Sequence, residues 1–93
     1  MAVARKLGIS LERYIVGDRL AGVKNGVNKL FTTAYEYVEG TISLYYNGVC
    51  QVEGVDYWQR ETGGAGAGFD AIEFIDRAPL SDDEITASYI AVR

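Results

Sequence analysis

The chain has 93 residues, of which 48% are hydrophobic and 24% charged, with a formal net charge of −4. This length suits one domain with one modest core, and the negative charge disfavours nucleic acid and anionic membranes as partners. Histidine is absent and Cys50 is the only cysteine, which removes the commonest general base, the commonest zinc ligand and any internal disulfide.

Residues 1–17 are expected to form an N-terminal arm ahead of a domain at residues 18–93. They lack the continuous apolar core of a signal peptide, and no apolar run of 18 residues follows, so we expect a soluble protein made in a cytoplasm. Leu7, Leu11 and Tyr14 have helix-like spacing, but Gly8 interrupts it. The arm is too apolar for a solvated tail, so it is expected to lie on the domain or on a neighbouring subunit. The alternative is a first β-strand over residues 12–16.

Two short strands are expected next. Residues 19–24 have strand character and end at the turn dipeptide Asn25-Gly26. Residues 29–34 combine Leu30 and Phe31 with two β-branched threonines, which favours a second strand. Residues 35–40 are interpreted as the end of that strand and a connector, with Gly40 making the turn into Thr41.

The pattern of residues 41–57 predicts a β-hairpin, and we expect the remaining strands to be arranged around it. Ile42, Leu44 and Tyr46 alternate on one face, and Asn47-Gly48 tolerates positive φ at both centres of a two-residue turn. The returning strand covers residues 49–53. Cys50 lies within it and is expected to be a buried, unreactive thiol.

The second half of the chain continues the pattern of short strands and turns. Residues 56–62 precede a glycine-rich segment, 63–68, which is expected to be a flexible loop. Residues 69–75 place Ile72 and Phe74 on one face, and residues 78–84 form a turn. The last strand, 85–92, has alternating faces: Ile85, Ala87, Tyr89 and Ala91 on one, and Thr86, Ser88, Ile90 and Val92 on the other. Such spacing is typical of an all-β protein, and we predict a small antiparallel β-sandwich.

Candidate chemistry in the sequence is weak. Gly66, Gly68 and Ala71 match a loose dinucleotide-binding pattern, but the residues that follow have strand rather than helix character. Asp82, Asp83 and Glu84 could hold a calcium ion only if the backbone curled around it, so solvated turn charge is the simpler interpretation. We therefore predict no enzyme activity, no cofactor and no metal site.

Aromatic and apolar residues indicate an interface instead. Tyr46, Tyr57 and Tyr89 fall on the predicted inner faces and are assigned to the core. Several other large side chains are left facing outward, which a free monomer should avoid. The predicted interface residues are Leu11, Tyr14, Tyr45, Trp58, Ile90 and Val92. An alternative is a stacking site for a carbohydrate or receptor, formed by Trp58, Tyr45 and the glycine-rich loop.

A set of short motifs in fixed order resembles a small β-sandwich domain found in tail- and fibre-associated virion proteins of tailed bacteriophages. The matching motifs, within residues 20–91, are NGVN at 25–28, FT at 31–32, GT at 40–41, LYYNGV at 44–49, GVDY at 54–57, IEF at 72–74, AP at 78–79 and ASY at 87–89. The resemblance implies an immunoglobulin-like sandwich with a structural role in the virion. We therefore expect a component of the tail, neck or capsid that binds copies of itself and other virion proteins. The alternative is a carbohydrate- or receptor-binding module of a tail fibre.

Overall fold

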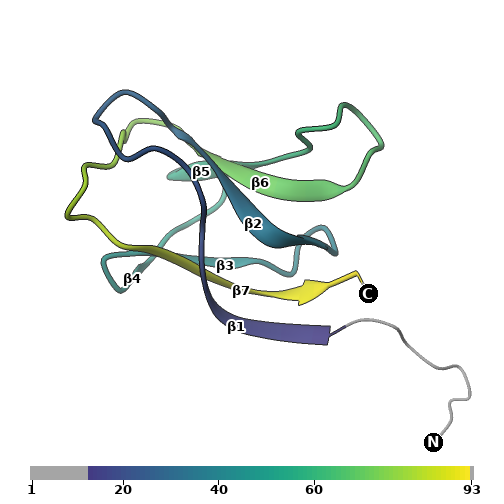
Figure 1. Cartoon of the computed structure of the whole chain (residues 1–93). Helices are drawn as coiled ribbons and strands as arrows, with labels where there is room; N and C mark the ends of the chain where they lie inside the picture. Colours follow the sequence, from purple (N-terminus) through teal and green to yellow (C-terminus); the bar gives the residue numbers. More distant parts are fainter. Residues whose placement is uncertain (1–12, 93) are drawn as a thin grey trace, which may run out of the picture.

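The computed structural model describes residues 13–92, which form seven β-strands and no helix (Figure 1). The all-β prediction is therefore confirmed. The strands are β1 (Arg13–Arg19), β2 (Leu30–Tyr37), β3 (Ser43–Tyr46), β4 (Val49–Cys50), β5 (Tyr57–Arg60), β6 (Phe69–Phe74) and β7 (Ile85–Ala91).

The strands form one curled antiparallel sheet. Their order is β4-β3-β7-β2-β6-β5, and β1 pairs with β7 as well. One half of the sheet thus contains β1, β7, β3 and β4, and the other contains β2, β6 and β5. The halves join where Tyr37 of β2 pairs with Ala91 of β7, and again where Ala21, beyond β1, bridges to Thr32. Because of these links the pairing does not divide the strands into the two separate sheets of the predicted sandwich.

β1 occupies the region where the sequence allowed either an arm or a first strand. It spans residues 13–19, so the expected boundary between arm and domain at residues 17 and 18 falls inside a strand. Its pairing with β7 shifts register between Ile15 and Asp18, where Gly17 has a φ of 69°. The rest of the expected arm, including Leu11, lies outside the described residues. The strand expected at residues 19–24 is wrong: beyond Arg19 only the isolated bridge at Ala21 remains.

A partly buried hydrogen bond fastens the end of β1 to the rest of the sheet. The hydroxyl of Tyr89 in β7 donates to the carboxylate of Asp18 at 2.5 Å, and the same oxygen accepts the N–H of Ala34 in β2 at 2.9 Å. Burial, and then the bond to Asp18, raise the pKa of Tyr89 above its ordinary value. The hydroxyl therefore remains a donor at neutral pH, and three strands meet at one carboxylate.

The predicted hairpin is confirmed. Tyr46 pairs with Val49 across a two-residue turn in which Asn47 has a φ of 51° and Gly48 a φ of 82°. Both values are positive, as a turn of this kind requires. The returning strand β4 is only two residues long, shorter than expected.

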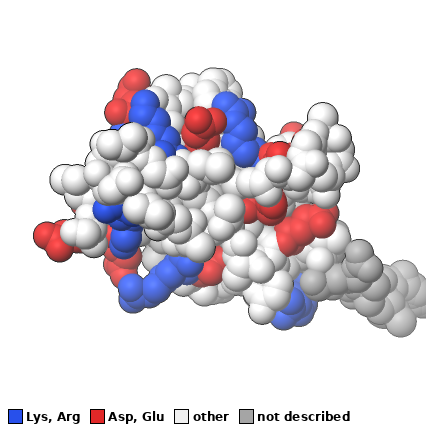
Figure 2. All heavy atoms as spheres, turned by 45° about the horizontal axis from the view of Figure 1, so that its top comes forward, with Lys and Arg blue, Asp and Glu red and all other residues white. Residues whose placement is uncertain are grey.

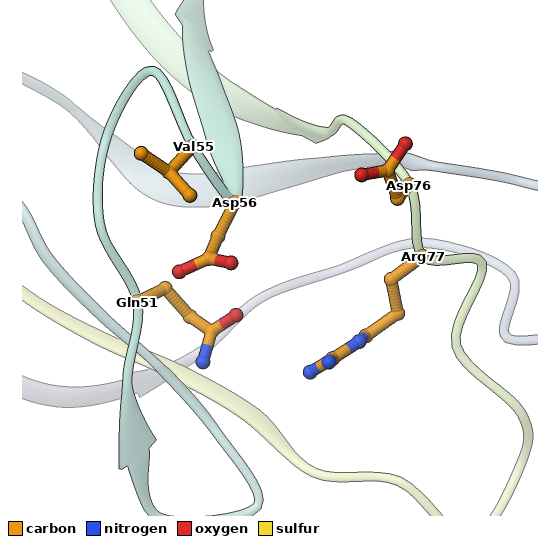
Figure 3. A pocket seen from close by; sticks show the side chains of 5 residues that line it. All are labelled: Gln51, Val55, Asp56, Asp76 and Arg77. Carbon is orange, nitrogen blue, oxygen red and sulfur yellow. The ribbon is translucent and has the colours of Figure 1, made fainter.

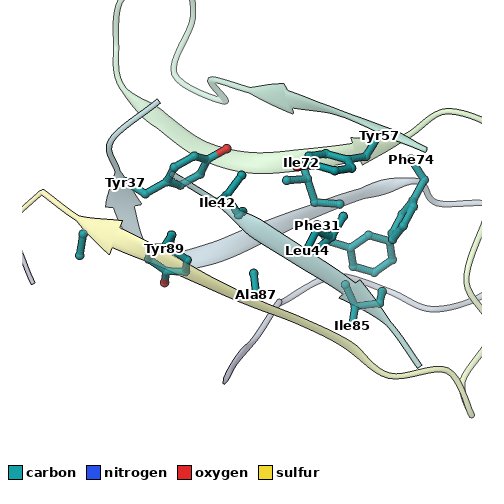
Figure 4. Close-up of a cluster of buried hydrophobic side chains, with 11 residues drawn as sticks. Phe31, Tyr37, Ile42, Leu44, Tyr57, Ile72, Phe74, Ile85, Ala87 and Tyr89 are labelled. Carbon is teal, nitrogen blue, oxygen red and sulfur yellow. The ribbon is translucent and has the colours of Figure 1, made fainter. Parts of the chain in front are cut away.

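The core lies inside the curl of the sheet (Figure 4). In β7 the four residues predicted to face inward are all buried, and so are Ile72 and Phe74 of β6. Of the three tyrosines assigned to the core, Tyr57 and Tyr89 are buried and Tyr46 is half-buried against it. The aromatic rings pack at an angle to one another: the Phe31 and Phe74 centroids lie 5.9 Å apart, and those of Tyr37 and Tyr89 5.5 Å apart.

Candidate interaction surfaces

The outer side of the β1, β7, β3 and β4 half carries a group of uncharged side chains. Antiparallel pairing places directly opposite residues on the same side of a sheet. The pairs on this side are Tyr14 with Ile90, Ser43 with Ser88, and Thr86 with Tyr45, which is in turn opposite Cys50. Their neighbours along β3 and β7, such as Leu44 and Ala87, are buried, so this side is directed outward. We call the residues Tyr14, Ser43, Tyr45, Cys50, Thr86, Ser88 and Ile90 the uncharged face.

Charges occur at one corner of this face. Arg19 lies opposite Thr86, and its guanidinium pairs with Glu84 at 2.9 Å. At the other end Tyr14 is 68% exposed, and the neighbouring Val16 on β1 is 72% exposed. The face therefore combines exposed apolar groups, small hydroxyl side chains and a charged corner. This composition resembles the core and rim of a protein interface more than a solvated sheet surface.

The outer side of β2, β6 and β5 has a different character. Trp58 and Leu30 flank Glu73 from the two neighbouring strands, and the Nε of Arg60 pairs with the carboxylate of Glu73 at 2.8 Å. Figure 2, with the top of Figure 1 turned forward, shows basic and acidic side chains interspersed on the visible surface. A mixed surface of this kind is what a solvated sheet usually carries.

The structure brings together some of the predicted interface residues and separates others. Tyr14 and Ile90 are opposite each other, and Tyr45 lies on the same uncharged face. Val92 is half-buried just beyond β7, and Leu11 is outside the described residues. Trp58 is on the opposite half of the sheet, 43% exposed, with its ring close to Gly54. Because Trp58 and Tyr45 belong to different outer faces, the stacking site expected from them and the glycine-rich loop is not formed.

The glycine-rich loop is held by specific hydrogen bonds. One carboxylate oxygen of Glu61 accepts the N–H groups of Gly66 and Gly68 at 3.1 and 2.9 Å, and Asp70 accepts the N–H of Thr62 at 2.8 Å. Gly68 lies directly against the carboxylate of Glu36, and a Cβ at this position would overlap it. The loop that was expected to be flexible is therefore held closed. The carboxylates of Glu61 and Asp70 accept backbone N–H groups in place of backbone carbonyls.

Cys50 was expected to be buried, and this prediction is wrong. Its thiol is exposed, because the short strand β4 lies at the sheet edge and places Cys50 opposite Tyr45 on the outer side. The hairpin alternation buries Leu44, and the residue across from Tyr45 must then point outward. Gln51, the next residue, is the buried one, with only 8% of its surface exposed.

The acidic turn after β6 fastens the hairpin. The carboxylate of Asp83 accepts hydrogen bonds from the Tyr46 hydroxyl at 2.5 Å, the Asn47 amide at 3.0 Å and the backbone N–H of Leu80 at 2.8 Å. The bonds from Tyr46, Asn47 and Leu80 lower the pKa of Asp83 to about 2. Within residues 13–92 no group of three or more Cys, Asp or Glu side chains is placed to hold a metal ion.

A small polar pocket lies at the opening of the curl between β4, β5 and the segment after β6 (Figure 3). Its volume is about 130 Å³, and it is lined by Gln51, Val55, Asp56, Asp76 and Arg77. The Gln51 amide N–H donates to the carbonyl of Val49 at 2.9 Å, and one carboxylate oxygen of Asp56 accepts the N–H of Val52 at 2.8 Å. The Arg77 guanidinium lies 4.1 Å from the ring centroid of Tyr46. Sequence reasoning missed this pocket, because no spacing signal links residues 51, 56 and 77.

Comparison with protein families, with curated proteins and with solved structures gave no match. Among residues 13–92 no helix is long and apolar enough to cross a membrane.

Proposed function

We propose that this chain is a structural component of a tailed-bacteriophage particle that associates with copies of itself through the uncharged face. In this proposal it has no catalytic activity, needs no cofactor, and docks with other virion proteins on the tail, neck or capsid. The virion setting rests on the sequence resemblance alone. The mode of assembly rests on the character of the uncharged face.

The absence of charge is the observation that carries the proposal. When two identical surfaces meet across a two-fold axis, each charged group near the axis faces a like charge, which costs free energy. The seven residues of the uncharged face carry no such group, whereas the other outer face carries Arg60 and Glu73. A chain with a net charge of −4 repels its own copies in most orientations. Contact through an uncharged sheet face therefore has the smallest electrostatic cost.

A matched pair of variants tests this proposal. Tyr14→Glu adds a carboxylate on the uncharged face, whereas Val27→Glu adds one at a comparably exposed position in the turn after Asn25-Gly26; the two residues are 68% and 77% exposed. Sedimentation velocity over a concentration series should show self-association of the unaltered protein. We expect Tyr14→Glu to weaken it at least about tenfold, as desolvating a charge in an interface costs more than 1.4 kcal/mol. Val27→Glu should leave it unchanged.

Two results would contradict the proposal. One is a protein that remains monomeric at high concentration and does not bind phage particles lacking it. The other is equal association of the Tyr14→Glu and Val27→Glu variants, which would place the contact elsewhere.

A further inference from the structure

We propose that the pocket formed by Gln51, Asp56, Asp76 and Arg77 binds the hydroxyl groups of a saccharide. The pocket contains no residue of the uncharged face, so this site is independent of the assembly proposed above.

The side chain of Gln51 is 8% exposed and directed into the pocket (Figure 3). Its amide nitrogen is held by the carbonyl of Val49 at 2.9 Å. This bond fixes the orientation of the amide and leaves the Oε1 atom facing the pocket. Within the described residues no hydrogen bond to that oxygen is formed, and a buried acceptor of this kind is normally satisfied by water or by a ligand.

The opposite wall supplies donors. The Arg77 side chain extends toward Gln51 across the pocket in Figure 3, and stacking on the ring of Tyr46 at 4.1 Å orients its guanidinium. Within residues 13–92 Arg77 makes no ion pair, so its planar set of N–H groups is available. The carboxylate of Asp56 lies beside Gln51 and keeps one oxygen that does not accept the Val52 N–H.

A ligand between these walls must both donate and accept hydrogen bonds. An ammonium group donates to Gln51 and Asp56 but cannot accept from Arg77, and a carboxylate accepts from Arg77 but is repelled by Asp56 and Asp76. A hydroxyl group does both, and vicinal hydroxyls match a guanidinium on one side and a carboxylate on the other. A volume of about 130 Å³ admits one edge of a sugar ring, so recognition involves a terminal residue of a glycan.

The test uses the full chain, labelled with ¹⁵N and titrated with the methyl glycosides of glucose, galactose, mannose and rhamnose. We expect one of them to shift the Gln51 side-chain amide signals saturably, with a dissociation constant on the order of 10 mM. Arg77→Leu should weaken binding at least about tenfold, whereas Arg60→Leu, on the mixed outer face, should not.

The proposal is overturned if no glycoside produces a saturable shift at concentrations of about 100 mM, ten times the expected dissociation constant. Unchanged affinity in Arg77→Leu also overturns it. The titration follows signals of the pocket in dilute protein, so a negative result would not contradict the assembly proposal. Conversely, a protein that binds the glycoside but remains monomeric would support the saccharide site and contradict self-association.

Discussion

Replacing Tyr89 by phenylalanine removes only the hydroxyl that joins β7 to Asp18. The ring of Tyr89 is fully buried and should keep its packing against Tyr37. The carboxylate of Asp18 would lose its 2.5 Å bond and retain only the N–H of Ala34. The substitution therefore isolates one hydrogen bond to a charged group at the meeting point of three strands.

The magnitude follows from the nature of that bond. A hydrogen bond to a charged partner contributes about 1.5–3 kcal/mol to stability, and the loss here leaves a half-buried carboxylate with one partner fewer. We expect a decrease of about 2 kcal/mol in the free energy of unfolding, which for a domain of this size lowers the thermal midpoint by about 8–16 °C. Asp18→Ala should cost at least as much, because it leaves the Tyr89 O–H without its acceptor in a partly buried position.

Urea unfolding of the two single variants and the double variant measures the interaction directly. The double-variant cycle should give a coupling energy of about 1.5–3 kcal/mol between Tyr89 and Asp18. Tyr14→Phe is the matched control, since Tyr14 is on β1 and 68% exposed, and its change should stay below about 0.5 kcal/mol. A coupling energy below about 0.5 kcal/mol would refute the assignment of Asp18 as the fastening point of β1.

Three further outcomes are expected. Gly48→Val should lower the free energy of unfolding by about 1–3 kcal/mol through strain at a φ of 82°, and an unchanged thermal midpoint would show that the turn is misassigned. The pKa of Asp83 falls from 3.8 to about 2 on folding. Its contribution to the stability of the folded state is therefore complete above pH 3.8 and is lost as the pH drops toward 2. Asp83→Asn should therefore reduce the loss of stability between pH 3.8 and 2. An unchanged loss in this variant would show that the Asp83 carboxylate does not cause it. Cys50 should react with a thiol reagent in the native monomer nearly as fast as in the unfolded chain, and more slowly on self-association; slow labelling of the monomer would contradict its exposure.

The parts of the fold that could be predicted from sequence are those set by local patterns. Strict alternation in residues 85–91 identified which side of β7 is buried, and Asn47-Gly48 identified the hairpin turn because few other dipeptides accept positive φ at two positions. These signals depend on neighbours within a few residues, and a single strand or turn satisfies them.

What could not be predicted depends on contacts between distant residues. Asp83 lies 36 residues from Asn47 and Asp18 lies 71 from Tyr89, and no local pattern distinguishes such carboxylates from solvated turn charges. The exposure of Cys50 required knowing that β4 is an edge strand of two residues. The polar pocket draws on three separate segments, so it exists only once the sheet has curled.

The pairing of β1 with β7 determines how the domain responds to mechanical load. Arg13 and Ala91 lie opposite each other at the same end of this pair, so tension applied to the backbone at these two residues pulls the strands apart sideways. The interstrand bonds then carry the load one after another, beginning at Arg13 and Ala91, rather than sharing it in shear. Separation would proceed as far as the Asp18–Tyr89 bond while the core under β2, β3 and β6 stays packed. We therefore expect the domain to yield at low force when tension acts on Arg13 and Ala91.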